Sequence, residues 1–357
     1  MKFTIVTPSF KQLDYLECCI ASVADQGTRN GGRRAEDGGQ EESENVGRCE
    51  SGKGALLRSV SAGSQSYAGL AEQLSVEHIV QDAGSPGIEE FAEKTAERLL
   101  RQYGGERVKN LEPFEILHLR TSHGYSLRIF KEPDEGMYDA VNRGLKKGTG
   151  KICAYLNCDE QYLSGALGWV VHWFGEKPRQ EVLFGDAIIV NPACGYICSR
   201  RAMVPQPLHT LTSGNLSIFT SSTFFRSRLL DQGFVFDKKW KDVGDADWAL
   251  RMIRAGISCR APGVPLSTFA ETGENRNMRP QALREKEALR RTAPAWARIL
   301  APLILAAYRI RRFWAGAYSR RPVQYAIYMM HALAVRCEFG PFHSVARWPR
   351  RTKGITP

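Results

Sequence analysis

The sequence contains no apolar run of the roughly 18 residues that a transmembrane helix requires. The longest candidate, residues 299–308, is about half that length and lies between Arg298 and Arg309. The first eight residues form one short apolar segment, which predicts a β-strand rather than a signal peptide. These features argue against an integral membrane protein and favour a cytoplasmic one.

Paired cysteines are also missing. None of the nine cysteines forms a Cys-x-x-Cys pair, and they do not have the spacing of a disulfide-rich secreted domain. Cys194 and Cys198 lie four residues apart, but no second Cys or His pair completes a zinc site. Free thiols in a reducing cytoplasm are therefore the simpler interpretation.

Acidic residues are scarce in the C-terminal part of the chain. Residues 276–357 contain 15 Arg and 2 Lys against 3 Glu, a net charge of +14, whereas residues 1–275 carry −3. Such a basic segment favours an anionic partner, either nucleic acid or the inner face of a membrane. A nucleic-acid-binding protein would also carry basic and aromatic residues across its body. The near-neutral body therefore predicts no nucleic-acid partner, and it favours a protein that attaches peripherally to the inner membrane face.

Within this basic segment, residues 294–314 mix apolar, aromatic and Arg side chains. That composition is typical of a helix that lies in the plane of a membrane interface. The alternative is a helix that packs on the protein core and leaves its Arg side chains in water.

Short apolar runs alternate with amphipathic segments along the rest of the chain, which predicts an α/β fold. Its sheet should be mostly parallel and flanked by helices. Expected strands are 3–7, 77–81, 126–131, 152–156 and the region 182–190; expected helices are 15–24, 88–103, 137–147, 165–174, 222–230, 248–255 and 281–318. Residues 28–75 lack periodic apolar residues and are predicted to be a disordered insertion. The expected domains are therefore 1–275, with this insertion, and a basic helical extension, 276–357.

Ligands of parallel sheets bind beyond the carboxyl ends of the strands, and two such ends carry acids. Asp159 follows the strand 152–156 and is placed to bind Mg²⁺ or Mn²⁺, although it could instead cap the next helix. Asp82 follows the strand 77–81 and could accept hydrogen bonds from a base or ribose, or form an Asx turn before Gly84. No G-x-G-x-x-G or P-loop sequence occurs at either turn, which argues against a classical nicotinamide site and a P-loop.

Two further acidic segments precede predicted helices. Asp134, Gly136 and Asp139 belong to a loop and helix start that could hold a phosphate or ribose of a cofactor, or be an ordinary polar helix start. Asp245 belongs to an acidic cluster, with Asp242 and Asp247, before an apolar helix. Mutual repulsion in such a cluster raises a carboxylate's pKa toward that of a general base, and helix capping is the alternative.

Five segments occur in a characteristic order: Thr-Pro-Ser-Phe at 7–10, Glu-His-Ile-Val-Gln-Asp-Ala-Gly-Ser at 77–85, Asp-Glu-Gly-Met-Tyr-Asp-Ala-Val-Asn-Arg-Gly-Leu at 134–145, Gly-Lys-Ile-Cys-Ala-Tyr-Leu-Asn-Cys-Asp-Glu at 150–160, and Gly-Asp-Ala-Asp-Trp at 244–248. This set resembles the family 2 glycosyltransferases over roughly 1–26 and 76–260. The resemblance implies a GT-A, Rossmann-like fold. It also implies inverting transfer of a sugar from a nucleotide-diphospho-sugar, with Mn²⁺ or Mg²⁺.

The same resemblance assigns roles to individual residues. Asn157 and Asp159 match the ends of the family's metal-binding Asp-x-Asp motif, and Asn157 replaces its first acid, so metal binding rests on Asp159. Asp82 matches the acid that contacts the base or ribose, although a second, adjacent acid is missing. Pro8 and Ser9 match the loop that lines the nucleotide.

Asp245 matches the family's catalytic base. The expected activity is a single, hexosyltransferase-like transfer from a UDP- or GDP-sugar to a saccharide or lipid-linked acceptor, in cell-surface polysaccharide or glycolipid biosynthesis. No Gln/Arg-x-x-Arg-Trp motif of processive members is present. The alternative enzyme class, a sugar-phosphate nucleotidyltransferase, needs a Gly-rich basic loop after the first strand, and residues 7–11 do not supply one.

Overall fold

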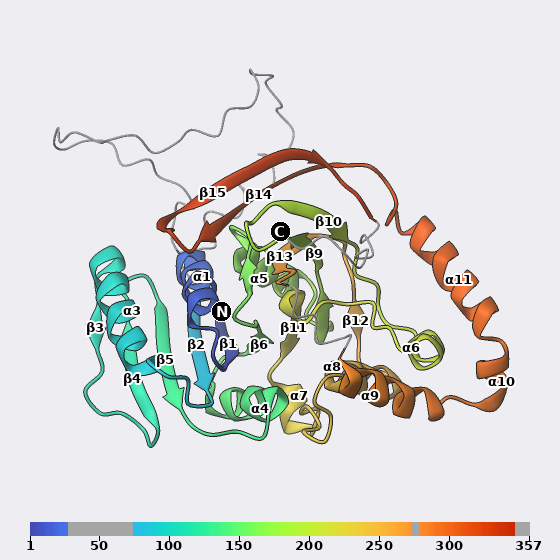
Figure 1. The fold of residues 1–357 in the computed structure, drawn as a ribbon, viewed down its shortest axis with the longest axis horizontal. Coiled ribbons are helices and arrows are strands. Elements are labelled where there is room, and N and C mark those ends of the chain that lie inside the picture. Colours follow the sequence, from blue (N-terminus) through green and yellow to red (C-terminus); the bar gives the residue numbers. More distant parts are fainter. Residues whose placement is uncertain (28–73, 273–278, 347–357) are drawn as a thin grey trace.

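The computed structural model describes residues 1–27, 74–272 and 279–346 (Figure 1). The insertion expected at 28–75 lies outside these residues except at its C-terminal end. Leu74 is buried in the core and Ser75 begins strand β2, so these last two residues of the expected insertion belong to the described fold.

Nine of the described strands form the main sheet, in the order β12-β8-β11-β6-β1-β2-β5-β4-β3. Their bounds are β1 Lys2–Ser9, β2 Ser75–Asp82, β3 Glu106–Arg107, β4 Glu115–Arg120, β5 Tyr125–Lys131, β6 Ile152–Tyr155, β8 Val182–Phe184, β11 Thr223–Arg226 and β12 Cys259–Arg260. The four central strands β6, β1, β2 and β5 are parallel, as predicted, and antiparallel β11 and β4 extend the sheet on either side.

Successive residues of a strand point to opposite faces of the sheet, and both faces of these parallel strands are apolar. Helices therefore cover both faces. Phe3 and Ile5 of β1 pack with α1, α3 and α5, whereas Val6 packs with α4 and α8. The described helices are α1 Leu13–Ala24, α3 Ile88–Tyr103, α4 Met137–Lys147, α5 Ala166–Glu176, α6 Pro207–Ser213, α7 Arg228–Asp231, α8 Gly244–Arg254, α9 Pro280–Arg291, α10 Ala295–Ile299 and α11 Ala301–Trp314, with short 3-10 turns η1 Asp25–Gly27 and η3 Thr220–Ser222.

A second sheet has the strand order β10-β9-β13-β7, and its strand β7 follows β6 of the main sheet in the chain. Its strands are β7 Glu160–Tyr162, β9 Asp186–Val190, β10 Tyr196–Arg200 and β13 Pro265–Ala270. Since only four residues separate the end of β6 from the start of β7, this sheet lies next to the turn that contains the predicted metal-binding residue Asp159.

The helix predicted at 222–230 is wrong. Residues Thr223–Arg226 form strand β11 between β6 and β8, and only the short helix α7 follows. The segment begins Thr-Phe-Phe, and β-branched and aromatic residues favour strands when a sheet offers pairing partners on both sides. Its buried phenylalanines, Phe224 and Phe225, point to opposite faces and join the two core clusters.

The basic extension contains the predicted helices, as α9, α10 and α11, and then a β-hairpin that the sequence pattern did not predict. The hairpin strands are β14 Pro322–Met329 and β15 Ala332–His343. In Figure 1 the hairpin, in red, runs from α11 across the top of the molecule to α1. Among the described residues, no helix is both long enough and apolar enough to span a membrane.

A buried ion pair fixes this hairpin to the body of the protein. Arg336 of β15 donates from Nη2 to Oδ1 of Asp25 at 2.7 Å and from Nη1 to the carbonyl of Tyr162 at 2.8 Å. The side chains of Arg336 and Asp25 are 7% and 9% exposed. Tyr328 of β14 donates its hydroxyl hydrogen to Asp25 at 2.9 Å, so both hairpin strands converge on one carboxylate.

Replacing Arg336 with Met should lower the free energy of unfolding by about 3–5 kcal/mol, because Asp25 would remain buried without its counter-ion. Chemical denaturation measures this change. The matched control is Arg107→Met, which breaks an exposed pair with Glu93 and should cost at most about 1 kcal/mol. Equal, small losses in the two variants would show that the ion pair does not hold the hairpin in place.

Candidate functional site

The parallel register brings the predicted strand-end residues to one edge of the sheet. Ser9 of β1 lies directly opposite Asp82 of β2, and the amide of Ala83 donates to the Ser9 carbonyl at 3.0 Å. The amide of Leu156, just after β6, donates to the carbonyl of Val6 at 2.9 Å. The segments that follow β1, β2 and β6 therefore start side by side.

Asp82 forms the Asx turn that was the alternative to a ligand role. Its carboxylate is fully buried and accepts hydrogen bonds from the amides of Gly84 at 2.8 Å and Ser85 at 2.6 Å. The hydroxyl of Ser85 donates to the same carboxylate at 2.7 Å and accepts from the amide of Lys11 at 2.7 Å. Asp82 thus links the loop after β2 to the loop after β1, and contact of Asp82 with a nucleotide stays a prediction.

Pro8 and Ser9 lie next to the segment after β6. The thiol of Cys158 donates to the carbonyl of Pro8 at 3.4 Å, and burial raises the pKa of this thiol to about 12, so it is neutral. Ser9 is buried and Pro8 is partly exposed. A ligand at this edge would therefore meet Pro8 more directly than Ser9.

The turn from Asn157 to Glu160 separates two neighbouring acids. Glu160 is buried, and its carboxyl group accepts a hydrogen bond from the amide of Asn157 at 2.7 Å. Burial first, and then the charge of Asp159, raise the pKa of Glu160 to about 8, so it holds its proton near neutral pH. Asp159 is the partly exposed member of the pair. Asp159 is therefore the acid of this pair that a ligand can reach.

The loop before α4 contains three predicted residues with different environments. The buried Asp139 accepts from the amide of Glu135 at 3.0 Å and pairs with Arg143 at 2.8 Å, so it holds the helix start together. Gly136 has φ of +121°, a conformation that favours glycine, and its amide donates to Asp134 at 2.8 Å. Burial first, and then the charge of Asp139, raise the pKa of Asp134, and Asp82 contributes to the same shift. The amide of Glu132, at the start of this loop, donates to the carbonyl of Asp82 at 2.9 Å, so the loop begins beside the edge with Asp82.

Asp245 lies in the first turn of α8, against a buried tyrosine. The hydroxyl of Tyr138 donates to Asp245 Oδ1 at 3.4 Å and accepts from its amide at 3.2 Å. The amide of Ala246 also donates to Oδ1, at 2.8 Å, and no hydrogen bond from the described residues reaches Oδ2. Burial raises the pKa of Asp245 to about 6, against the lowering effect of these hydrogen bonds.

Asp247, another acid of this cluster, has a structural contact. Asp247 pairs with Arg251 one turn along α8, at 2.8 Å, and so stabilises the helix as an i, i+4 ion pair. Gly244 allows the helix to approach α4, because a Cβ at this position would lie 2.6 Å from the ring of Tyr138. The contact between Asp245 and Tyr138 therefore depends on glycine at position 244.

Glu285 of α9 belongs to this site but was not predicted from the sequence. Its buried carboxylate accepts the amides of Lys241 at 2.9 Å, Asp242 at 2.9 Å and Val243 at 3.1 Å. Burial favours a higher pKa, but these hydrogen bonds and one from Gln281 hold the pKa of Glu285 below its ordinary value. The amides just before α8 are thus satisfied by a side chain of the C-terminal extension.

No sequence signal pointed to Glu285, because its partners are backbone groups more than 40 residues away. Tyr138 could have been found, since it lies inside the segment 134–145 that carries the family resemblance. Lys286, next to Glu285, lowers the pKa of Asp245 through its charge, while burial lowers the pKa of Lys286 itself. A side chain of the extension therefore influences the pKa of the candidate base.

The loop before α4 connects the strand-end residues, such as Asp82, with the residues around Asp245. Lys241 donates from Nζ to the carbonyl of Glu135 at 2.6 Å, and Lys238 pairs with the carboxylate of Glu135 at 3.0 Å. This loop therefore touches the segment that leads to Asp245, and its first residue, Glu132, is hydrogen-bonded to Asp82 at the strand-end edge. The metal-binding candidate Asp159 lies at that edge, after β6.

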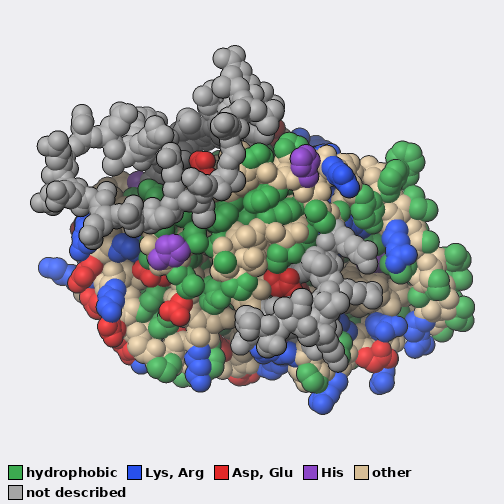
Figure 2. All heavy atoms as spheres, turned by 45° about the horizontal axis from the view of Figure 1, so that its top comes forward, with side chains coloured by type: hydrophobic (Ala, Val, Ile, Leu, Met, Phe, Trp, Pro, Cys, Tyr) green, Lys and Arg blue, Asp and Glu red, His purple; other side chains and the backbone are tan. Residues whose placement is uncertain are grey.

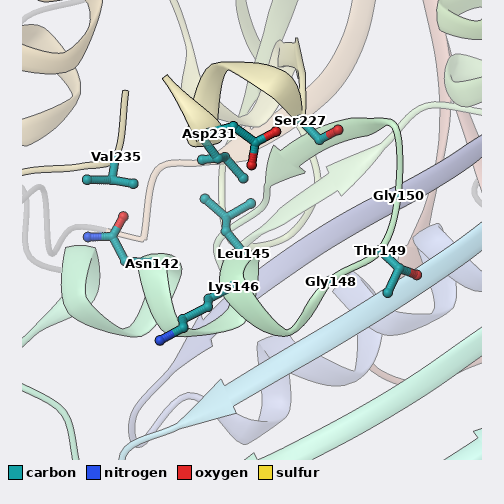
Figure 3. A pocket seen from close by; sticks show the side chains of 10 residues that line it. Asn142, Leu145, Lys146, Gly148, Thr149, Gly150, Ser227, Asp231 and Val235 are labelled. Atoms are coloured by element: carbon teal, nitrogen blue, oxygen red, sulfur yellow. The ribbon is translucent and has the colours of Figure 1, made fainter. Parts of the chain in front are cut away.

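A cavity of about 520 Å³ lies at the opposite, amino end of β6 (Figure 3). Leu145 and Lys146 of α4, the glycines at 148 and 150, and Asp231 of α7 are among its lining residues. None of the predicted site residues contributes to it. The cavity is thus separate from the edge where Ser9, Asp82 and Asp159 lie.

No protein-family model matches the chain. A segment of 67 residues, 18% of the chain, is 34% identical to PGL/p-HBAD biosynthesis glycosyltransferases of Mycobacterium bovis (strain BCG / Pasteur 1173P2) and Mycobacterium tuberculosis (strain ATCC 25177 / H37Ra). The match spans about a quarter, 26%, of the length of these curated relatives.

Two solved structures are similar to the chain at low sequence identity. S. aureus TarS 1–349 in complex with UDP-GlcNAc has a TM-score of 0.43 and 15% identity, over 88% of this chain and 73% of that chain. The mannosyltransferase PcManGT from Pyrobaculum calidifontis, in complex with GDP-Man and Mn²⁺, has a TM-score of 0.44 and 14% identity, over 86% and 75%.

Replacing Glu285 with Ala should lower the free energy of unfolding by at least about 1.5–3 kcal/mol, because buried amides before α8 lose a charged acceptor. The low pKa of Glu285 means that this stabilisation is complete above the pKa of the unfolded chain, and is lost as the pH falls through the folded-state value. Glu287→Ala, an exposed position on the same helix, is the matched control. Denaturation curves that coincide for the two variants at neutral pH would refute the capping role.

Proposed function

We propose that this protein is a glycosyltransferase that moves a sugar from a nucleotide-diphospho-sugar to an acceptor hydroxyl. The observation that carries the proposal is Asp245, a partly buried acid with a pKa of about 6, held by Tyr138 and leaving Oδ2 without a described donor. A general base is most effective when its pKa lies near the working pH. The local 34% identity to curated glycosyltransferases supports the same activity.

The donor, a UDP- or GDP-sugar, is proposed to bind at the strand-end edge. Pro8 and Ser9 would line the nucleotide, and the loop shaped by Asp82 would lie beside the base or ribose. Asp134 and Gly136, at the start of α4, would lie toward the ribose and phosphates, since a helix N-terminus favours an anion. Each of these segments already belongs to one edge of the sheet, so the donor needs no assembly of distant elements.

The residues fit a divalent cation that is held mainly by the donor. Among the described residues, no group of three or more His, Cys, Asp or Glu side chains is placed to hold a metal ion. Mg²⁺ and Mn²⁺, however, bind nucleotides with one or two protein carboxylates and complete their shell with phosphate oxygens and water. Asp159, partly exposed beside the neutral Glu160, would supply that carboxylate, with Asn157 close by. A bound cation would neutralise the charge that develops on the diphosphate.

The proposed reaction is a direct displacement at the anomeric carbon. Asp245 removes the proton from the acceptor hydroxyl as its oxygen forms a bond to that carbon. The bond between the anomeric carbon and the donor phosphate oxygen breaks, and its electron pair leaves with the nucleoside diphosphate. Attack from the face opposite the leaving group inverts the configuration.

The wider assignment follows the resemblance in the sequence. We propose a GT-A-type, inverting, single-transfer enzyme of cell-surface polysaccharide or glycolipid assembly, with a saccharide or lipid-linked acceptor and no nucleic-acid partner. A cytoplasmic place of action is part of the same proposal.

Replacing Asp245 with Asn should reduce kcat by about 10²–10⁴-fold, because the amide keeps the size of the carboxylate but cannot take a proton. Donor affinity should change little, since the base acts on the acceptor. In the wild type, kcat/KM should rise with pH and level off above about pH 6, as Asp245 ionises. The measurement is a steady-state assay with UDP- and GDP-sugars over a range of pH.

Asp247→Asn is the matched control in the same helical turn. It removes the ion pair with Arg251 and should lower thermal stability while turnover stays near the wild-type value. Loss of turnover in Asp247→Asn, with normal turnover in Asp245→Asn, would move the base two residues along the chain.

Replacing Asp159 with Ala should abolish the Mn²⁺-dependent part of nucleotide diphosphate affinity and leave the thermal midpoint without ligand unchanged. Isothermal titration with UDP and GDP, with and without Mn²⁺, measures this. Glu160→Gln serves as the control, because Gln resembles the protonated acid, and it should keep the metal dependence. An unchanged metal dependence in Asp159→Ala would rule out Asp159 as the ligand.

A further inference from the structure

Large apolar side chains are exposed along α10, the short turn after it, and α11. We call them the apolar face; they are Trp296, Ile299, Leu300, Leu303, Ile310, Phe313 and Trp314. Their exposed fractions range from 42% to 80%. Figure 2 shows hydrophobic side chains mixed with Lys and Arg along the right-hand edge, where α10 and α11 lie in Figure 1. Exposed apolar patches of this kind mark interaction sites.

The arrangement of α11 explains why this face is free. Tyr308 and Arg312, one turn apart, are the buried residues of the helix, and Tyr308 stacks on His209 of α6 with 3.6 Å between ring centroids. At 100° per residue, Leu303, Ile310 and Trp314 lie on the opposite side of the helix. The helix thus attaches to the protein through one side and presents a second apolar side to the surroundings.

The helix is also held rigidly. Arg311 donates from Nη1 to the carbonyl of Val204 at 3.0 Å, and the guanidinium of Arg312 lies over the rings of Tyr308 and Tyr318. A preformed, fixed face loses little conformational entropy when it binds a partner.

Charge identifies the partner. No acidic residue occurs between Glu287 and Glu338, a stretch that contains nine arginines. Arg298 and Arg309 are exposed beside the apolar face and form no ion pair with any described residue. Apolar side chains bordered by arginines match the boundary between the acyl chains and anionic headgroups of a bilayer. A second copy of the chain is a poorer partner, because a symmetric pairing would place arginines against arginines.

We propose that α10 and α11 form a membrane-binding surface, in which the apolar face enters an anionic bilayer and the flanking arginines contact its headgroups. Binding is peripheral, because the face belongs to one side of a surface helix. The earlier expectation of a lipid-binding C-terminal segment is thereby narrowed to these two helices, since α9 caps the start of α8 and the hairpin β14–β15 is anchored at Asp25.

The test is co-sedimentation of the full chain with phosphatidylcholine vesicles that contain phosphatidylglycerol, and with pure phosphatidylcholine vesicles. The wild type should bind the anionic vesicles and lose binding as salt is added. The variant Ile310→Ser/Phe313→Ser/Trp314→Ser should bind them more than about tenfold more weakly. Since these side chains are exposed, its thermal midpoint should stay close to that of the wild type.

Two further variants separate the sources of binding. Arg298→Gln/Arg309→Gln should weaken binding to the anionic vesicles and reduce its salt dependence. Leu111→Ser/Phe114→Ser removes other exposed apolar side chains, from the loop between β3 and β4, and should bind like the wild type. Wild-type binding by the α11 triple variant would overturn the proposal. The proposal would also be wrong if the wild-type chain did not bind anionic vesicles but self-associated through this face in sedimentation velocity. Neither measurement depends on sugar transfer, so the membrane-binding proposal is tested independently of the proposed activity.

Discussion

Parallel pairing of β6, β1, β2 and β5 is the constraint on which the rest of the structure depends. It directs the carboxyl ends of these strands to one edge, so residues separated by more than 70 positions in sequence start side by side. Parallel strands also require helices on both faces, because neither face can be left in water. The site is therefore a product of strand direction, and each loop adds its own polar groups to a common edge.

Hydrogen bonds within these loops decide which acids face a ligand. Asp82 and Asp139 are occupied by backbone amides and by Arg143, and Glu160 is buried and neutral near pH 7. Asp159 and Asp245 differ from these acids because both are partly exposed, and Asp245 accepts its described hydrogen bonds through Oδ1. The proposed division into a metal-binding acid and a base thus rests on exposure and on the positions of the two residues at a strand end and at a helix start.

The C-terminal extension contacts the body of the protein through two of its parts, and a third part is exposed. Glu285 of α9 satisfies the amides before α8, and Arg336 of β15 forms a buried pair with Asp25. The helices between them, α10 and α11, instead leave apolar side chains exposed beside arginines. The strongly positive net charge of this region in the sequence therefore does not reveal its two structural roles or the surface that we propose for a bilayer.

The sequence by itself determined the presence of the central strands, the exact bounds of α3 and α4, and the positions of Asp82 and Asp159 at strand ends. The spacing of apolar residues and the residues that favour turns are local properties of a sequence, and these features depend on them. Only the tertiary structure decided that residues 223–226 pair as a strand, that β14 and β15 form a hairpin, and that Glu285 and Tyr138 surround the start of α8. Those outcomes depend on partners far away in sequence. A local pattern cannot reveal which distant backbone amides need an acceptor, or which buried surface a helix must cover.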